Sequence, residues 1–532
     1  MCVNRVVLFT IYILFRIGNS LVYGENLYHS LINSDIHNDI EWQSLLHFKY
    51  GKSTINSNST FFLYEHGQSD ARIEYIATIN GLYDIGLIDD ESVQCRYPGR
   101  IYFIKNKLQI EQDLFTQYEC ISYNEYIDKV PIDNVYIVFA SDDNNNPSSI
   151  MGHSFLKLSG IDKDGIFREH AFSFFAIFDT DDMPIINYSK SLFNGTKGMY
   201  ILTPYKNKIN EYINEQGRSL WEFEIEMSSD ERWTLKRHLW ELKEHEIHYR
   251  FIMHNCNTAL INVLKLVNRH FDVNNYQIFI TPIEYIMQLF NNNKIVNISI
   301  IPTVVHRDII NLYGLPDILY TPKSTRLSIA YEKLLHKFVD IKFHPVYKYI
   351  HDYQVDSFNE YESKMMSVNI KYNIDKNKLI INSLELLKSK LILDYAITES
   401  FSKYLKISLE DNILNDRYSI GPSFEIGRGI GVYTGQTVIY CIGIAGYAYS
   451  IKNSIYAAPE FGVIFKSINS IKLTASCVYY YDFLYNIRGY NIKYNFHLDF
   501  SLDKDSRLFF EYIKYAGGFE ENNLKFGAAL HF

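Results

Sequence analysis

Residues 325–532 are built from short segments in which apolar and polar residues alternate. In the clearest segment, the apolar positions are Ile492, Tyr494, Phe496, Leu498 and Phe500. The positions between them are Lys493, Asn495, His497 and Asp499. A two-residue period over about ten residues is what a strand of a transmembrane barrel requires, because lipid offers no hydrogen-bond partner to an open sheet edge. The pattern predicts an antiparallel transmembrane β-barrel of roughly ten to fourteen strands.

A soluble β-sandwich with one face in water would show the same alternation, and it is the alternative fold for residues 325–532. Two further features favour the barrel. The last segment, residues 524–532, repeats the pattern and ends on the aromatic Phe532. Aromatic residues make up 16% of the chain, with 44 Tyr, and such side chains gather where a barrel meets the membrane surface. A biased genome would also raise the Tyr count.

The first residues read as a secretory signal. Arg5 supplies a positive flank, residues 6–15 supply a short apolar core, and Val22-Tyr23-Gly24 resembles a cleavage site. Residues 1–24 are therefore predicted to be a signal peptide, with an uncleaved anchor as the alternative. A net charge of −9 leaves no basic stripe for phosphates, so nucleic acid is not an expected partner. We expect a bacterial outer-membrane protein whose N-terminal part lies in the periplasm.

Five cysteines would remain after cleavage, at positions 95, 120, 256, 441 and 477. An exported chain meets an oxidising compartment, and Cys95 and Cys120 are close in sequence, so we expect a disulfide between them. Such a link would stabilise the fold by roughly 3 kcal/mol. Cys256 has no obvious local partner, and a free thiol in an exported protein needs a reason.

Between the signal and the barrel, the chain divides into two regions. Residues 25–130 are expected to be mostly helical, with a strand-like stretch at 100–104. Residues 131–300 alternate strands and helices, which predicts an α+β fold. Strands are expected at 135–139, 154–158, 171–178 and 220–227. Helices are expected to start after a cap at Ser228 or Ser229, and near Cys256.

Cys256 and His153 are the residues that suggest chemistry. Cys256 is placed at the start of an apolar helix, where unpaired N–H groups and the helix dipole favour a thiolate. His153 follows Gly152 at the start of an apolar strand, where it would be held rigidly as a general base. Either residue alone could simply be a buried side chain with no role in catalysis. Because both occur, each at the start of an apolar element, the sequence predicts a nucleophile and its base.

A longer pattern supports this pairing. Residues 145–156 read Asn-Asn-Pro, two small residues, two apolar residues, Gly-His, then Ser-Phe-Leu, and an Asn255-Cys256 pair follows a hundred residues later. Between them lie Arg218 with residues 220–222, and residues 238–242. Over about residues 90–270 this resembles the bacterial family with the Lnb (lacto-N-biosidase) N-terminal periplasmic domain, formerly a domain of unknown function (DUF4105). That domain is similar to permuted papain-like thiol enzymes, the group that includes the NlpC/P60 and lecithin retinol acyltransferase proteins.

The resemblance implies a permuted papain-like domain with Cys256 as nucleophile and His153 as base. It also implies a third polar residue that orients the histidine from the next strand. The family tends to have Asn there, whereas this chain has Ser173, with His170 as a substitute on the same strand. Asn255 is predicted to cap the Cys256 helix, or to donate to an oxyanion as well.

Three histidines offer a rival site. His245, His248 and His254 could ligate a metal, but no carboxylate or Cys pair completes a recognisable motif, so neither a metal nor a cofactor is predicted. The main hypothesis is an outer-membrane-anchored periplasmic thiol hydrolase or acyltransferase acting on amide or ester bonds in peptidoglycan, protein or lipid. The alternative is a non-catalytic assembly or maturation factor that carries an inactive papain-like domain.

Overall fold

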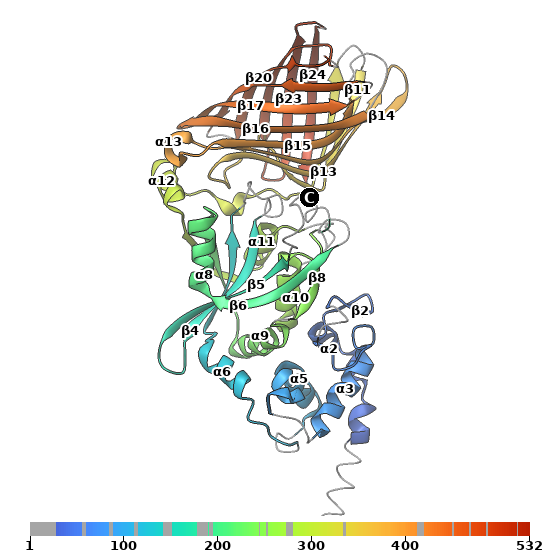
Figure 1. Ribbon diagram of the computed structural model, residues 1–532, viewed down its shortest axis with the longest axis vertical. Helices are drawn as coiled ribbons and strands as arrows, with labels where there is room; N and C mark the ends of the chain where they lie inside the picture. The colour runs from blue at the N-terminus through green and yellow to red at the C-terminus, as the bar shows by residue number, and fades with distance from the viewer. Residues whose placement is uncertain are drawn as a thin grey trace, which may run out of the picture.

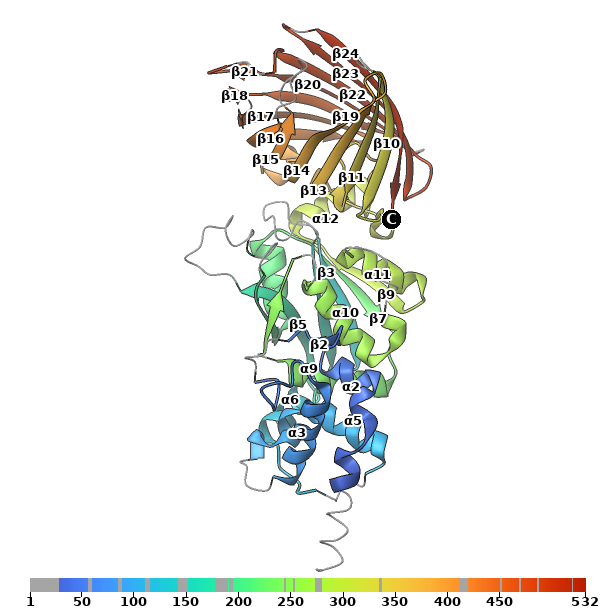
Figure 2. The same cartoon turned by 90° about the vertical axis from the view of Figure 1, so that its right-hand side faces the viewer.

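The computed structural model describes residues 28–532, with gaps at 56–59, 85–88, 111–114, 142–151, 178–189, 191–194, 244, 252–253, 273–279, 334–336, 412–419, 450–451, 468–469, 486–487 and 519. The predicted signal peptide and the Asn-Asn-Pro stretch therefore lie outside the described residues. Figures 1 and 2 show three tiers: a β-barrel, a sheet-and-helix body below it, and a helical N-terminal region at the far end.

The barrel is a closed antiparallel ring of twelve strands in the described part of the chain. Its strands are β10 (Arg326–Lys333), β11 (Lys337–His344), β13 (Glu360–Asn373), β14 (Lys378–Ile392), β15 (Ser402–Asp411), β16 (Ile420–Thr434), β17 (Thr437–Tyr449), β19 (Glu460–Lys466), β20 (Ile471–Tyr479), β22 (Ile492–Ser501), β23 (Ser506–Ala516) and β24 (Glu521–His531). Three short strands pair alongside the ring: β12 (Val346–Lys348), β18 (Asn453–Ala457) and β21 (Tyr481–Asp482). The predicted antiparallel barrel is confirmed.

The two faces of the barrel wall differ as the alternation predicts. On β24, Leu524, Phe526 and Leu530 are exposed on the outer face, while Lys525 and His531 are buried inside. The interior is filled by ion pairs, such as the 2.9 Å contact between Lys525 Nζ and Asp340 Oδ2 and the 3.2 Å contact between Arg507 Nη1 and Asp499 Oδ2. The charged side chains inside the barrel thus pair with one another, and the apolar side chains on the outer face suit contact with lipid.

The body is a seven-stranded antiparallel sheet in the order β8-β6-β5-β4-β3-β7-β9. Its strands are β3 (Asn134–Ala140), β4 (His153–Ile161), β5 (Phe167–Ile177), β6 (Thr196–Pro204), β7 (Leu220–Ile225), β8 (Glu246–Tyr249) and β9 (Ile295–Ile301). The four strands expected from the sequence are present as β3, β4, β5 and β7. The other three were not anticipated.

Helices cover both faces of this sheet. On one face, α9 (Ser229–Leu242) and α10 (Cys256–Val267) pack against each other, and α10 lies on β4 and β5. On the other face lie α8 (Tyr205–Ile209) and the π-helix η6 (Asn210–Glu215) that follows it. Ser228 caps α9 in a reciprocal capping box with Glu231, which settles the choice between Ser228 and Ser229. The body is therefore α+β; its identification as permuted papain-like stays a prediction.

The N-terminal region contains η1 (Asp35–Asn38), α2 (Ile40–Leu45), β1 (Phe48–Lys49), β2 (Lys52–Ser53), α3 (Ala71–Tyr83), η2 (Asp89–Glu91), α4 (Val93–Arg96), α5 (Pro98–Leu108) and α6 (Ile121–Lys129). The expected strand at 100–104 is wrong, because these residues belong to α5. Pro98 stands at the first position of that helix, which suits its fixed φ, and Ile101 and Ile104 bury one helical face. The expected disulfide between Cys95 and Cys120 is present.

A buried polar network fastens this region to the body. Arg100 pairs with Glu74 at 2.7 Å, and both side chains are fully buried. The backbone N–H of Arg100 donates to Glu241 on α9 at 2.9 Å, and Glu241 also contacts His238 at 3.3 Å. His238 in turn lies 2.9 Å from His47 across the boundary. His238 and Glu241 therefore hold two parts of the fold together.

The chain passes from body to barrel through α11 (Pro282–Asn291), β9, α12 (Val304–Tyr313) and η8 (Ile318–Tyr320). Glu284 on α11 is buried and accepts hydrogen bonds from Thr281 and from the backbone N–H of Ser324, just before β10. Among the described residues, no helix combines the length and apolar character needed to cross a membrane.

The disulfide joins the start of α6 to α4. Replacing Cys95 and Cys120 together by Ala is expected to lower the free energy of unfolding by about 3 kcal/mol, because the open loop regains conformational entropy in the unfolded state. Denaturant unfolding followed by tryptophan fluorescence measures the change; one of the four Trp, Trp240, reports locally because its indole N–H donates to the Cys95 carbonyl. An unchanged midpoint would contradict the assignment of the link as stabilising.

Phe496 and Asn495 are neighbours on β22 that face opposite sides of the wall. Phe496→Arg is expected to block insertion, because a charge at mid-strand on the lipid face costs about 2–4 kcal/mol. Asn495→Arg is the matched control and is expected to insert. Heat-modifiable migration of the membrane fraction reports the folded barrel. Equal insertion of both variants would contradict the assignment of the faces.

Candidate functional site

Cys256 is the first residue of α10, as the sequence predicts. Asn255 is the N-cap: its Oδ1 accepts from the backbone N–H of Thr258 at 3.0 Å. The predicted cap is therefore confirmed. The Nδ2 of Asn255 donates to the carbonyl of Phe251 at 2.9 Å, so in this state the amide is engaged away from an oxyanion. The cap fixes Cys256 at the positive end of an apolar helix.

The thiol of Cys256 is buried, with 8% of the residue exposed. It borders a cavity of about 10 Å³, whose apolar lining is formed by Phe155, Leu156, Phe172, Phe174, Tyr200, Leu260 and Val263. Burial is the largest influence and raises the pKa of the Cys256 thiol. The backbone and hydroxyl of Ser154, the backbone of Asn257 and the guanidinium of Arg218 oppose it, but the pKa remains raised. The thiol is thus protonated at neutral pH, with groups beside it that favour a thiolate.

His153 begins β4, directly before Ser154. Its ring lies 6.2 Å from that of Tyr212 and 6.1 Å from that of Phe155, measured between centroids. Successive residues of a strand point to opposite faces, so Ser154 faces Cys256 while His153 packs with Tyr212 on the other face. Burial, aided by Arg218 and Lys208, lowers the pKa of His153 to about 3. His153 and Cys256 lie at the same end of the sheet, but no hydrogen bond joins them in the described contacts.

Gly152 controls how the chain enters β4. Its φ is +77°, and a Cβ there would lie 2.2 Å from the ring of Phe139 and 2.8 Å from the carbonyl oxygen of Ala140. Only glycine tolerates both constraints. The backbone at Gly152 thus passes close to Phe139 and Ala140, and this approach sets the position of His153.

Ser173 and His170 both lie on β5 but face opposite sides. Phe172 pairs with Leu156, so Ser173 falls on the face of Phe155 and His153. Ser173 is buried, and its hydroxyl has no hydrogen-bond partner among the described residues. His170 pairs with Leu158, further along the strand and on the opposite face. Of the two candidates for the third residue, Ser173 is the one that shares a face with His153.

Arg218 was part of the sequence resemblance but was not singled out as a site residue. It is buried, its Nε donates to the Ser141 carbonyl at 2.6 Å, and its Nη2 donates to the Ala140 carbonyl at 3.1 Å. Its guanidinium lies 5.0 Å from the ring centroid of Tyr212. The charge of Arg218 adds to the lowering of the His153 pKa by burial and opposes the raising of the Cys256 pKa by burial, so both candidates lie within the influence of this one cation.

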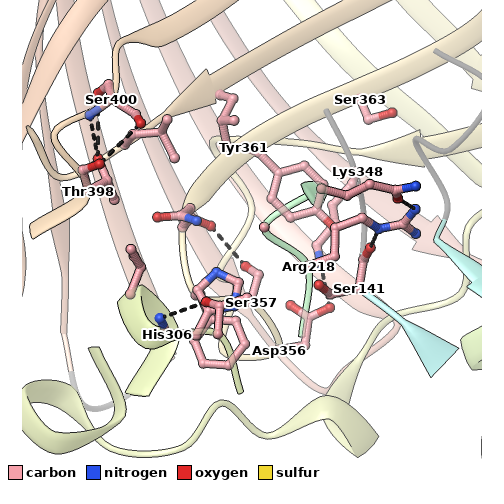
Figure 3. A pocket seen from close by; sticks show the side chains of 18 of the residues that line it. Ser141, Arg218, His306, Lys348, Asp356, Ser357, Tyr361, Ser363, Thr398 and Ser400 are labelled. Atoms are coloured by element: carbon pink, nitrogen blue, oxygen red, sulfur yellow. Dashed lines mark hydrogen bonds and ion pairs between the residues drawn. The ribbon is translucent and has the colours of Figure 1, made fainter. Parts of the chain in front are cut away.

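A much larger cavity, of about 730 Å³, lies between the body and the barrel (Figure 3). Ser141 and Arg218 line its body side, His306 of α12 lines its base, and Tyr361 and Ser363 line its barrel side. Tyr361 and Ser363 alternate along β13 with Glu360 and Glu362, whose carboxylates pair with lysines inside the barrel. On the β13 side the cavity therefore lies against the outer face of the barrel wall, while Tyr347, which packs on Arg326 at the end of the barrel interior, also lines it.

Neither Cys256 nor His153 is among the residues that line this cavity. Phe139, whose ring contacts Gly152, and Arg218 do line it and stand between the cavity and the two candidates. His306 accepts or donates a 2.6 Å hydrogen bond with Ser219 and stacks on Phe358 with centroids 4.0 Å apart. Burial lowers the pKa of His306 to about 4. The cavity and the surroundings of the two candidates therefore have Phe139 and Arg218 in common.

The three histidines of the rival metal site have different contacts. His245 packs against Phe61, His248 pairs with Lys197 in the β6–β8 ladder, and His254 forms an isolated bridge with Arg250. The described ranges hold no cluster of three His, Cys, Asp or Glu side chains placed to bind a metal ion.

Comparison with known proteins gives two family matches. Residues 122–292 match the Lnb N-terminal periplasmic domain, and residues 34–107 match a domain of unknown function, DUF7843. No curated protein matches. Among solved structures, the KdgM porin is 11% identical, with 39% of this chain and 99% of the porin covered and a TM-score of 0.25. Outer membrane phospholipase A from Escherichia coli is 10% identical, with 40% and 98% covered and a TM-score of 0.24.

The family match supports the resemblance seen in the sequence. Together with a closed barrel that is apolar outside and charged inside, it places the barrel in the outer membrane and the N-terminal domain in the periplasm. The end of the barrel that meets the body is accordingly the periplasmic end (Figure 1).

The burial of Cys256 predicts slow alkylation at neutral pH. Because the folded pKa is raised, the thiolate is scarce at pH 7, and labelling by iodoacetamide is expected to be slower than that of a model thiol and to accelerate into the alkaline range. Peptide mapping separates Cys256 from Cys441 and Cys477, the other free thiols among the described residues. Labelling at pH 7 as fast as in the unfolded chain would contradict the protonated state.

Proposed function

We propose that the periplasmic body is a thiol hydrolase or acyltransferase, anchored by the barrel, in which Cys256 is the nucleophile. The observation that carries the proposal is the placement of Cys256 at the start of α10, with the backbone of Ser154 and of Asn257 directed at its sulfur. Backbone N–H groups at a helix start stabilise a thiolate, and later the oxyanion of an attacked carbonyl.

In the reaction, the Cys256 thiolate attacks the carbonyl carbon of an ester or amide. A C–S bond forms, the C–O or C–N bond breaks, and a thioester remains on the enzyme. His153 takes the thiol proton and delivers it to the departing alcohol or amine. Water then releases the acid, which makes the protein a hydrolase, or an amine takes the acyl group, which makes it an acyltransferase. The proton of the second nucleophile returns to the Cys256 sulfur through His153.

This mechanism requires a change from the resting arrangement. The imidazole of His153 must leave its stack on Tyr212 and approach the sulfur. Catalytic hydrogen bonds are often long or misaligned without substrate and tighten when it binds. Arg218 contacts Tyr212 and lines the 730 Å³ cavity, so a ligand there would meet the group that holds His153 in place.

Candidate substrates are amide or ester bonds of peptidoglycan, periplasmic protein or lipid. The cavity combines apolar walls, at Phe139, Ile213 and Trp221, with the cation of Arg218. Its place against the outer wall of the barrel suits a substrate presented at the membrane surface.

Cys256→Ala is expected to abolish the activity, by at least about a thousand-fold, because the nucleophile cannot be replaced by the rest of the site. Complementation of a deletion strain measures function, and intact mass spectrometry after incubation with cell-envelope extract detects a hydroxylamine-sensitive adduct. Cys477→Ala, which removes a free thiol from the barrel wall, is the matched control and should behave as the parent chain.

Two observations favour a second function. The raised thiol pKa and the packing of His153 on Tyr212 would also suit an inactive domain in a non-catalytic assembly or maturation factor. In that case Cys256→Ala complements fully and no adduct forms on the parent protein. Full complementation by the alanine variant overturns the thiol mechanism.

A further inference from the structure

Helix α12 is unusual among the helices of the body in how little of it is buried. Ile309 is its one buried residue among those described. At its C-terminal end, Leu312 is 63% exposed and Leu315, just beyond it, is 53% exposed, with Tyr313 exposed between them. Large apolar side chains that are exposed side by side on a protein surface mark an interaction site.

The location of α12 narrows the choice of partner. The helix lies beside α13 (Tyr395–Thr398) at the periplasmic end of the barrel (Figure 1). The hydroxyl of Tyr313 donates to the backbone carbonyl of Tyr433 on β16 at 3.3 Å. Asp394, which caps α13, bridges to Gly431 on the same strand. Both helices are thus held against the C-terminal end of β16.

The neighbouring side chains extend the apolar surface. Around α13, Tyr395 and Phe401 are exposed, with ring centroids 5.6 Å apart. On β16, Ile426, Ile430 and Val432 are exposed on the outer face of the wall, and Arg428, between them on the same face, lines the large cavity. The surface formed by Leu312, Tyr313, Leu315, Tyr395 and Phe401, named here the rim patch, therefore continues the lipid-facing band of the barrel.

We propose that the rim patch inserts into the periplasmic leaflet of the outer membrane and forms a membrane contact outside the barrel. Continuity with the band is the reason to choose lipid over a protein partner. An amphipathic helix beside a bilayer buries its apolar face at the headgroup boundary, and Tyr suits that depth because its ring is apolar and its hydroxyl polar.

The contact would fix the position of the large cavity relative to the membrane. The first residues of α12, Val304 to His306, line that cavity, and so does Phe401 of the rim patch. With the rim patch in the leaflet, the cavity is held at the membrane surface. The proposal concerns this contact alone, and it stands or falls independently of the chemistry of Cys256.

The test is quenching of tryptophan fluorescence by brominated lipid. Leu312→Trp and Leu315→Trp variants of the full chain are reconstituted in phosphatidylcholine vesicles with and without bromine on the acyl chains. Ile166→Trp is the matched control, since Ile166 is 51% exposed but lies in the β4–β5 hairpin, away from the barrel (Figure 1). The signal of the four native Trp is subtracted using the parent chain.

Emission of the new Trp at 312 or 315 is expected to fall at least two-fold in brominated vesicles, while that at 166 stays unchanged. Heat-modifiable migration confirms that each variant holds a folded barrel before it is compared. If both rim variants are quenched no more than Ile166→Trp, the rim patch faces water or a protein, and the proposal is overturned.

Discussion

The pairing of β10 with β24 is the contact on which the arrangement of the molecule depends. Eight residues of the first barrel strand pair with eight of the last, from Arg326 with His531 to Lys333 with Leu524. Without this pairing two strands would expose unpaired N–H and C=O groups to lipid, each at a cost of several kcal/mol. Closure also brings Phe532 to Thr325, where its N–H donates to the carbonyl at 2.9 Å. Because Ser324 is tied to Glu284 of α11, the closed ring fixes where the body is attached.

The barrel could be predicted from the sequence because lipid imposes one strict rule on every strand. On β24 each outward residue is apolar or small beyond Asn522, and Lys525 and His531 turn inward toward acidic partners. Residues 100–104 lie outside the membrane, so lipid places no such constraint on their pattern. An apolar run of that length fits a strand or a helix equally, and the decisive signal was Pro98 at the start of α5. The strands β8 and β9 were missed because they lie at the edges of the sheet and lack a continuous apolar run, and β6 was missed although it carries the short apolar run 199–202.

The candidate site could be predicted only where local sequence features determine the structure. A helix start at Cys256 and a strand start at His153 are local features, and both are present. Which face His153 occupies is not local: a shift of one residue at Gly152 would turn it to the face of Cys256. The large cavity could not be predicted from the sequence, because its walls come from residues as far apart in the chain as Phe139 and Arg428. Likewise, only the folded structure places Arg218 both in the cavity wall and close to His153.

The burial of Cys256 has a consequence for a protein in an oxidising compartment. Thiolates, and not thiols, attack disulfides and react with oxidants. The chain carries a disulfide between Cys95 and Cys120, and three described cysteines remain free. Because burial raises the pKa of Cys256, its thiolate is scarce at neutral pH, which slows both exchange with that disulfide and oxidation. The groups that would stabilise the anion, the backbone of Ser154 and Asn257, are already in place. The same arrangement therefore keeps the thiol protonated and, at the same time, holds beside the sulfur the groups that would stabilise its anion.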